Sequence, residues 1–184
     1  MANVLVINGH PDFAHSTANA AILEHFKTLV PDAVIRFVEK TVKAGTDYVA
    51  AEQKALRWAD VVVWQFPVYW YSVPAKMKQW IDDVLAYGFA YGTGGTALHG
   101  KKLVVSVTTG GAENEYTPEG AEHYTLKDFL VQFHQTAMFC GMQYLEPVVS
   151  YGMLVIPGVT SEKAKTDVLA KARRHAETLA ERAA

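Results

Sequence analysis

The sequence has little cysteine, little net charge and no long hydrophobic run. Its single cysteine, Cys140, excludes an internal disulfide framework. Lysine and arginine number 17 and aspartate and glutamate 19, so the formal net charge is only −2, and no basic tract is present to attract nucleic acid. The early apolar stretch NVLVIN is far too short to span a bilayer, and no signal-peptide pattern opens the chain. We therefore expect a soluble cytoplasmic protein.

What is present is the composition of an ordinary globular domain. Half of the residues are hydrophobic and 20% are charged, and a chain of 184 residues can bury a sizeable core. No linker, internal repeat or low-complexity stretch divides the chain. We therefore expect residues 1–184 to form a single domain, with Gly88–Gly100 as its one long loop.

Apolar runs alternate with helix-like stretches along the chain. The predicted strands are Val4–Ile7, Ala33–Val38, Val61–Phe66, Leu103–Thr108 and Gln143–Val149. The predicted helices are Ser16–Val30, Tyr48–Trp58, Pro74–Tyr87, Tyr124–Met138 and Ser161–Ala183. The strands beginning at Val4, Val61 and Leu103 are apolar without alternation, which is typical of strands covered on both faces. Strand alternating with helix predicts a doubly wound α/β parallel sheet with helices on both faces.

In such sheets, ligands bind beyond the carboxyl ends of the strands. Three loops follow strands there, at residues 10–19, 67–71 and 108–116. The first loop runs into a predicted helix with Ser16 as its N-cap, and a helix N-terminus binds phosphate readily. His10 adds a donor or a positive charge. The alternative is that Ser16 only caps its helix and the histidines belong to the loop surface.

The other two loops suit a flat ring. The middle loop contains three consecutive aromatic residues, Tyr69, Trp70 and Tyr71, whose rings prefer edge or offset contacts with other rings. The last loop contains Gly110 and Gly111, which permit positive φ and close backbone approach. Taken alone, these segments are equally typical of a core, a dimer contact or a glycine turn. Together the three loops predict a bound mononucleotide, with its phosphate at the first loop and a flat group such as a flavin between the others.

The sequence resembles the flavodoxin-like NAD(P)H:quinone oxidoreductases, in particular a bacterial NAD(P)H dehydrogenase branch that includes the ancillary subunits of glutathione-gated potassium efflux systems. The resemblance is carried by HPDFAHSTAN at 10–19, AAEQKALRWADVVVWQFPVYWYSVPAKMKQWIDDVL at 50–85, FAYGTGGTALHGKKL at 89–103 and TTGG at 108–111. It implies a flavodoxin-like sheet of five parallel strands in the order 2-1-3-4-5, bound FMN or FAD, and a homodimer with shared active sites. Because the chain ends soon after its last predicted helix, we expect FMN rather than FAD, with NADH or NADPH as co-substrate.

The resemblance also implies roles for individual residues. The implied flavin-binding residues are His10, Ser16, Thr17, Ala18, Asn19, Pro67, Val68, Tyr69, Trp70, Tyr71, Thr108, Thr109, Gly110, Gly111 and Tyr116. Tyr116 and His123 are the implied catalytic residues, which stabilise negative charge on the reduced flavin. Tyr71 and Tyr91 are implied to line the substrate pocket, with Tyr91 facing the pocket of the partner subunit.

Several other motifs carry less weight. Gly95–Lys101 nearly fits a phosphate-binding P-loop, but Lys102 stands where Ser or Thr is needed, and a strand follows instead of a helix. No G-x-G-x-x-G stretch lies between a strand and a helix, so we do not expect a Rossmann dehydrogenase. We expect no metal site, because the histidines form no cluster with cysteine. His25, His134 and His175 lie on predicted helices and are expected at the surface.

Three functions fit these patterns. The first is a flavin-dependent NAD(P)H:quinone oxidoreductase, in which hydride passes by a two-electron ping-pong route from NAD(P)H through flavin N5 to a quinone-like acceptor. The second is a flavin- and nucleotide-binding regulatory subunit of a potassium-efflux transporter, located at the inner face of the membrane. The third is a flavodoxin-type electron carrier, although carriers are typically strongly acidic and this chain has a net charge of −2. The resemblance favours the first function.

Overall fold

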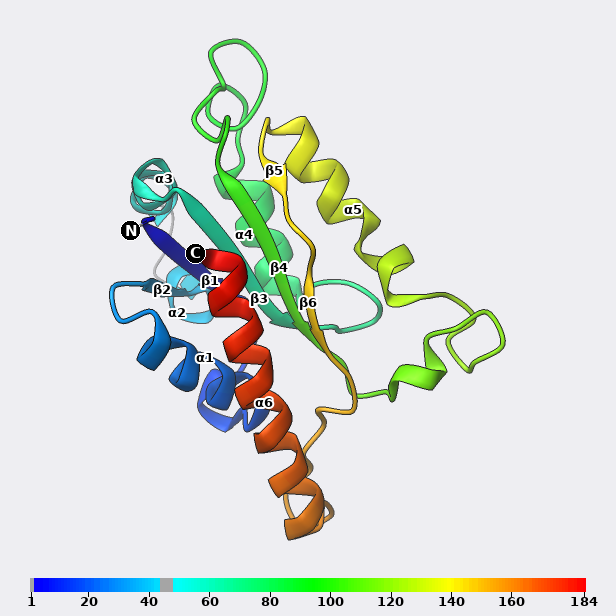
Figure 1. The fold of residues 1–184 in the computed structure, drawn as a ribbon. Coiled ribbons are helices and arrows are strands. Elements are labelled where there is room, and N and C mark those ends of the chain that lie inside the picture. Colours follow the sequence, from blue (N-terminus) through cyan, green and yellow to red (C-terminus); the bar gives the residue numbers. More distant parts are fainter. Residues whose placement is uncertain (1, 44–47) are drawn as a thin grey trace.

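A parallel sheet between two layers of helices forms the centre of the computed structural model, which describes residues 2–43 and 48–184 (Figure 1). The strands are β1 (Val4–Asn8), β2 (Val34–Phe37), β3 (Val61–Pro67), β4 (Lys102–Thr108), β5 (Gln143–Tyr144) and β6 (Val148–Ser150). They run in the order β2-β1-β3-β4-β5, and β6 also pairs with β4. Each pairing is parallel. The predicted fold class and strand order are confirmed.

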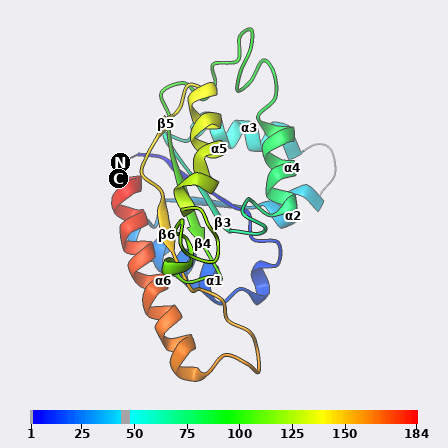
Figure 2. The ribbon, with the colours of Figure 1, turned by 90° about the vertical axis from the view of Figure 1, so that its right-hand side faces the viewer.

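The helices cover both faces of this sheet. They are α1 (Ala18–Leu29), α2 (Val38–Lys43), α3 (Tyr48–Trp58), α4 (Ala75–Val84), α5 (Leu126–Phe139) and α6 (Glu162–Ala183), with short 3-10 helices η1 (Phe13–His15) and η2 (Glu113–Glu115). α1 packs against α6 on one face, while α3, α4 and α5 contribute to the core on the other (Figure 2). Within the described residues, no helix combines the length and the apolar character needed to cross a membrane.

Strand β1 shows why the apolar runs lack alternation. Val4 and Val6 belong to the core beneath α1 and α6, whereas Leu5 and Ile7 belong to the core beneath α3, α4 and α5. All four side chains are buried, because each face of the sheet has its own layer of helices. The sheet is therefore open only at its edges and at the ends of its strands.

The last predicted strand, Gln143–Val149, is interrupted in the structure. It forms two short strands, β5 and β6, which pair with opposite ends of β4. Pro147 lies between them and has no N–H group to donate to a ladder, so pairing stops there. The interruption leaves β6 as a short strand paired with the carboxyl end of β4.

Helix α2 is an element that the sequence patterns did not predict. It follows β2 without a loop, and it buries Val38 and packs Val42 against the core beneath α4. Six residues are too few for a helical period to be recognised, and their helical state depends on this packing. Positions 44–47, between α2 and α3, lie outside the described residues.

Candidate functional site

A cavity of about 410 Å³ opens at the carboxyl ends of β1, β3 and β4, and we call it the carboxyl-end pocket. It is lined by the loops that follow these strands and by a segment that follows β6. The lining residues are His10, Asp12, His15, Ser16, Thr17, Ala18, Asn19, Pro67, Val68, Tyr69, Thr108, Thr109, Gly110, Met153, Leu154 and Val155. Parallel strands place their carboxyl ends at one edge, which brings these distant loops together. The volume falls within the roughly 300–1,000 Å³ of small-molecule sites.

Most of the predicted flavin-binding residues line this pocket. The exceptions are Trp70, Tyr71, Gly111 and Tyr116, which lie outside its lining. The segment Met153–Val155 was missed by the sequence reasoning, as were Asp12 and His15 as pocket residues. The carboxyl-end rule would have found Met153–Val155, had it been applied to the last strand as well as to β1, β3 and β4.

The N-terminus of α1 faces the pocket. Ser16 Oγ accepts a hydrogen bond from the Asn19 N–H at 3.2 Å, so Ser16 caps the first turn as predicted, although the helix itself begins at Ala18. The N–H groups of a first turn have no partner inside the helix, and the helix dipole favours a negative charge beside them. Thr17 and Ala18 both lie in the pocket wall, so this turn can hold an anionic group.

His10 contributes a neutral donor. Burial lowers the pKa of its imidazole, and the nearby Asp12 carboxylate opposes this shift only in part. His10 Nδ1 accepts the Asp12 backbone N–H at 3.1 Å, so Nε2 carries the proton of the neutral ring. Of the two roles expected for His10, a donor or a positive charge, the neutral ring therefore fits the donor. His15 Nδ1 lies 2.9 Å from the Asp12 carboxylate at the exposed rim of the pocket.

The aromatic loop makes a strained two-residue turn. The Tyr69 N–H donates to the Ser72 carbonyl at 3.0 Å, and the Ser72 N–H donates back to Tyr69 at 3.1 Å. Between them, Trp70 has φ of 47° and Tyr71 has φ of 64°, in the left-handed region that glycine and asparagine normally occupy. The Trp70 side chain is 92% exposed, so no packing of that ring offsets the strain within the chain. Strain of this kind is typical of a ligand-binding loop.

Replacing Trp70 by Asn and Tyr71 by Gly should raise the free energy of unfolding by about 1–5 kcal/mol. Each left-handed residue costs about 1–3 kcal/mol, which the Asn-Gly pair relieves. The substitution also removes the stacked contact between Tyr71 and Phe129, whose ring centroids lie 4.9 Å apart, and this loss lowers the gain in stability by about 1 kcal/mol. Urea denaturation measures the result. Trp70→Asn alone is the control that retains the stacked ring, and a double variant no more stable than the wild type would show that the turn is unstrained.

Tyr71 and Tyr116 meet over one ring beside the pocket. Tyr71 stacks on Phe129, and Tyr116 approaches the edge of Phe129 with centroids 6.3 Å apart. A hydrogen bond to Glu122 raises the pKa of Tyr71. Burial is the main cause that raises the pKa of Tyr116, and its hydroxyl is hydrogen-bonded to the side chain of Thr109 in the pocket wall. These rings therefore form an aromatic cluster that meets the pocket wall at Thr109.

The two glycines of the last loop differ from the expectation of positive φ, since neither has a left-handed φ. A Cβ at Gly111 would lie 2.6 Å from Glu115 Oε2 and 3.2 Å from the Tyr116 ring, so a side chain there would displace the Glu115 carboxylate. A Cβ at Gly110 would meet only Leu154, at an ordinary 3.7 Å. The chain itself does not require glycine at position 110, and its missing side chain leaves room within the pocket.

His123 and Tyr91 lie apart from the pocket lining. His123 has φ of 59° and follows Glu122, the carboxylate that contacts Tyr71. Tyr91 lies in the loop before β4, at the amino end of that strand and thus at the end of the sheet opposite the pocket (Figure 1). Its ring contacts Phe139 at the end of α5, with centroids 5.3 Å apart. Within one chain Tyr91 does not reach the pocket, so its predicted role requires a second copy.

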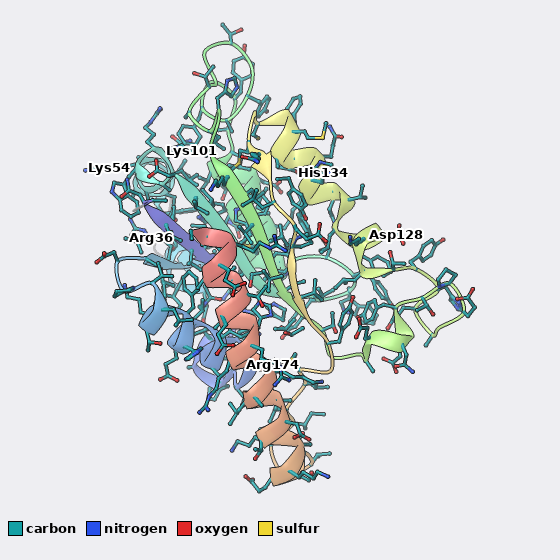
Figure 3. The ribbon with its side chains drawn as sticks, in the orientation of Figure 1. Arg36, Lys54, Lys101, Asp128, His134 and Arg174 are labelled. Carbon is teal, nitrogen blue, oxygen red and sulfur yellow. The ribbon has the colours of Figure 1, made fainter. Side chains whose placement is uncertain are left out.

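The expectation that the helical histidines lie at the surface is wrong for His175. His134 is exposed on α5 (Figure 3), but His175 on α6 is only 3% exposed. Its ring is held by two serines, with Nε2 2.7 Å from Ser106 Oγ and Nδ1 2.8 Å from Ser150 Oγ. Burial lowers the pKa of His175 to about 4, so the ring is neutral.

His175 belongs to a polar layer beneath the pocket. Its members lie on the α1–α6 side of the sheet and are Asn19, Gln65, Ser106, Thr108, Ser150 and His175. On this side, Val63, Val104 and Val148 each precede a polar residue by two positions, so the valine core gives way to polar groups toward the carboxyl ends. Polar residues within otherwise apolar strands were the signal that sequence reasoning did not use.

Comparison with known proteins identifies the family. The model of the flavodoxin-like fold family matches residues 2–178. The chain belongs to this family. Among curated relatives, the glutathione-regulated potassium-efflux system ancillary protein KefF of Salmonella arizonae is 46% identical over 145 residues, which cover 78% of this chain and 80% of the relative. The resemblance to the branch that contains such ancillary proteins is confirmed.

Solved structures also resemble this chain over nearly its whole length. General stress protein 14 of Treponema denticola, solved in complex with FMN, has 33% identity and a TM-score of 0.85, with 96% of this chain and 97% of that chain covered. An NADPH-quinone reductase from P. pentosaceus has 29% identity and a TM-score of 0.74, with 95% and 97% covered.

Proposed function

We propose that this protein is a flavin-dependent oxidoreductase of the NAD(P)H:quinone type that binds FMN in the carboxyl-end pocket. The observation that carries the proposal is the convergence of the α1 N-terminus, Pro67–Tyr69 and Thr108–Gly110 on one cavity. The FMN-bound relative, similar over nearly the whole chain, supports FMN as the cofactor. The NADPH-quinone reductase relative supports a nicotinamide donor and a quinone-like acceptor.

The donor set of the pocket fits FMN. The first turn of α1 and the hydroxyls of Ser16 and Thr17 would hold the phosphate. Backbone groups of Pro67–Tyr69 and Thr108–Gly110 would flank the flavin ring, with the space beside Gly110 available to it. The neutral His10 would donate a hydrogen bond from its Nε2–H to the bound FMN. None of these groups carries a negative charge that would repel the phosphate. The Asp12 carboxylate at the rim is paired with His15.

Bound FMN would supply the hydride chemistry that links a nicotinamide donor to the acceptor. The chain orients the reactants and stabilises charge. Burial and then Glu122 raise the pKa of Tyr116, so its hydroxyl keeps its proton. To donate that proton to the flavin, Tyr116 would exchange its hydrogen bond with Thr109 for one to the ligand. Tyr71 and Phe129 shield that side from water. His123, in the same loop as Tyr116, would donate a hydrogen bond to the flavin.

Purified protein mixed with FMN and freed of excess should retain a visible flavin spectrum, which NADH bleaches and a quinone restores. Chromatography of the retained flavin, after an equal exposure to FAD, identifies the cofactor. Retained FMN that NADH does not bleach would favour an electron carrier instead. Retention of neither flavin would contradict the proposal, because the pocket would then have no mononucleotide to hold.

A second copy of the chain would complete the site. The outer side of α5 carries exposed apolar side chains, with Val131 62%, Met138 57% and Phe139 65% exposed, and Phe139 contacts Tyr91. We propose a homodimer through this surface, with Tyr91 facing the substrate pocket of the partner. Sedimentation equilibrium of the wild type and of Phe139→Glu tests it: the variant should be a monomer, and a wild-type monomer would contradict the dimer.

A regulatory role is the second candidate function. The observation in its favour is the 46% identity to KefF, an ancillary protein of a glutathione-regulated potassium-efflux system. The oxidoreductase and the transporter-bound forms can coexist, since a docking surface need not involve the pocket. Co-purification of the tagged protein with a potassium-efflux transporter from membranes tests this role, and a protein found only in the free fraction would contradict it.

A further inference from the structure

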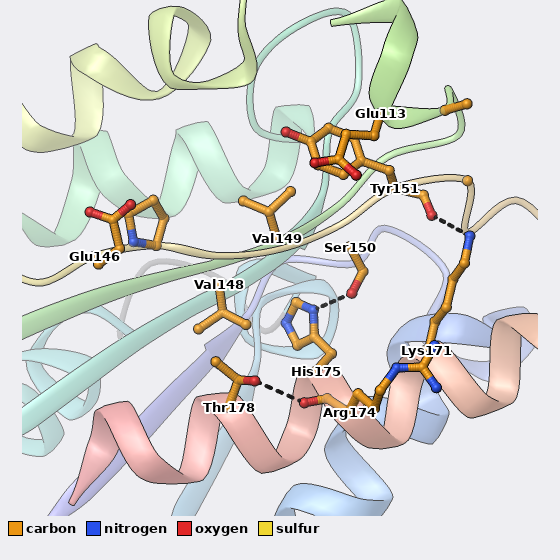
Figure 4. A pocket seen from close by; sticks show the side chains of 13 residues that line it. Glu113, Glu146, Val148, Val149, Ser150, Tyr151, Lys171, Arg174, His175 and Thr178 are labelled. Carbon is orange, nitrogen blue, oxygen red and sulfur yellow. Dashed lines mark hydrogen bonds between the residues drawn. The ribbon is translucent and has the colours of Figure 1, made fainter.

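The polar layer is one continuous chain of five hydrogen bonds. From one end, Asn19 Nδ2 lies 3.1 Å from Thr108 Oγ1, and Gln65 Nε2 lies 2.7 Å from Asn19 Oδ1. Ser106 Oγ lies 2.5 Å from Gln65 Oε1 and 2.7 Å from His175 Nε2. His175 Nδ1 then lies 2.8 Å from Ser150 Oγ (Figure 4). One end of the chain lines the carboxyl-end pocket, and the other end lines another cavity, between β6 and α6.

The protons of this chain have one consistent order. The Ser106 hydroxyl has one hydrogen, which it donates to Gln65 Oε1, so Ser106 Oγ must accept from His175 Nε2–H. A neutral imidazole with hydrogen on Nε2 has an acceptor at Nδ1, to which Ser150 donates its hydroxyl. Every bond in the chain therefore points the same way, from Ser150 toward the pocket.

The last member of the chain is Thr108. Gln65 Nε2–H donates to Asn19 Oδ1, and Asn19 Nδ2–H donates to Thr108 Oγ1. Thr108 Oγ1 accepts this bond and keeps its own hydrogen for another acceptor. Because Thr108 lines the pocket, a ligand bound there would be in a position to accept that hydrogen.

We propose that His175 is a positioning residue: its Nε2–H tautomer orders the buried chain and thereby presents the Thr108 hydroxyl as a hydrogen-bond donor to the ligand of the carboxyl-end pocket. The inference rests on the proposed function for the identity of that ligand, FMN. The chain can transmit this order because Asn19, Gln65 and Ser106 are buried, so no bulk water reorients their amides or hydroxyl. The reverse order would place hydrogen on Nδ1 and turn Thr108 into a donor to Asn19.

A double-mutant cycle on FMN affinity tests the proposal. Thr108→Val should weaken FMN binding about tenfold, because it removes one buried donor. His175→Leu should weaken binding about fivefold, because it removes the group that orders the chain. The double variant should bind FMN no more weakly than Thr108→Val alone, since His175 acts only through Thr108. Fully additive losses, or wild-type affinity in His175→Leu, would overturn the proposal.

Two variants separate positioning from simple destabilisation. Val168→Ala truncates another buried side chain of α6 that does not belong to the hydrogen-bonded chain. It should lower stability and leave FMN affinity unchanged, so a loss of affinity there would attribute the His175 effect to stability alone. His175→Gln can still donate an N–H to Ser106 and should bind FMN within about twofold of the wild type.

The tautomer of His175 can be read directly, without any variant. Nitrogen chemical shifts of the wild-type ring near pH 7 should show hydrogen on Nε2 and a bare Nδ1. Hydrogen on Nδ1 would overturn the proposal, because each hydrogen bond of the polar layer would then donate in the direction away from the pocket. Should wild-type protein fail to bind FMN, the proposed function fails, while the shifts still decide the proton order.

Discussion

Thr17→Asp should weaken FMN binding about 100-fold while leaving riboflavin binding within about threefold of the wild-type value. Thr17 lies at the start of α1, in the wall of the pocket where we place the phosphate. Two unit charges about 5 Å apart repel by roughly 2 kcal/mol at an effective dielectric constant near 40, and a phosphate carries nearly two charges. Riboflavin has no phosphate and should not detect the new carboxylate. Fluorescence titration with each flavin measures both affinities.

The same substitution should not harm the fold. Aspartate is favoured at the start of a helix, both as a cap and through the helix dipole, so thermal unfolding should show equal or higher stability. Thr17→Asn is the matched control, because asparagine has the same shape and no charge, and it should bind FMN nearly as the wild type does. An equal loss of FMN and riboflavin binding in Thr17→Asp would place the phosphate elsewhere.

The stability of the protein should fall by about 3 kcal/mol more in the wild type than in His175→Gln between pH 7 and pH 4. Burial lowers the pKa of His175 from 6.5 to about 4 in the folded state. Between these values the unfolded chain binds a proton that the folded chain excludes, so stability decreases as pH falls and levels off below about 4. Each unit of pKa difference corresponds to about 1.4 kcal/mol.

Urea denaturation at several pH values measures this effect. Other groups titrate in the same range, including His10, whose pKa is also lowered by burial. They contribute equally to the wild type and to His175→Gln, so the difference between the two curves isolates His175. Parallel curves would show that His175 titrates alike in the folded and unfolded states, in conflict with its buried position.

The sheet could be predicted from the sequence because each strand is recognisable from the pattern of its own residues. Runs such as Val61–Phe66 have no polar face, and only a strand covered on both sides tolerates that. The pocket followed from the sheet, because parallel strands bring the loops after β1, β3 and β4 to one edge. Met153–Val155, the pocket segment that follows β6, could have been predicted by applying the same rule to that strand.

Other features depend on contacts that no local pattern encodes. The left-handed φ values of Trp70 and Tyr71 oppose the preferences of bulky residues, so their sequence argues against the turn that the structure shows. His175 lies between Ala172 and Ala176 on the buried side of α6, where a helical histidine is unusual. Its burial depends on serines that lie 69 and 25 positions away in the sequence. Polar partners at such distances become visible only in the folded chain.

The buried histidine also fixes how α6 aligns on the sheet. The inner side of α6 is rich in alanine, with Ala172, Ala176 and Ala183 buried, and small side chains offer few ridges to prevent a helix from sliding. A slip by one turn would put Lys171 or Leu179 in place of His175 and leave Ser106 without its donor. An unsatisfied buried polar group costs about 1–3 kcal/mol, which is enough to disfavour the slipped packing. The two serine contacts of His175 thus act together with the hydrophobic packing in favouring the native alignment of α6.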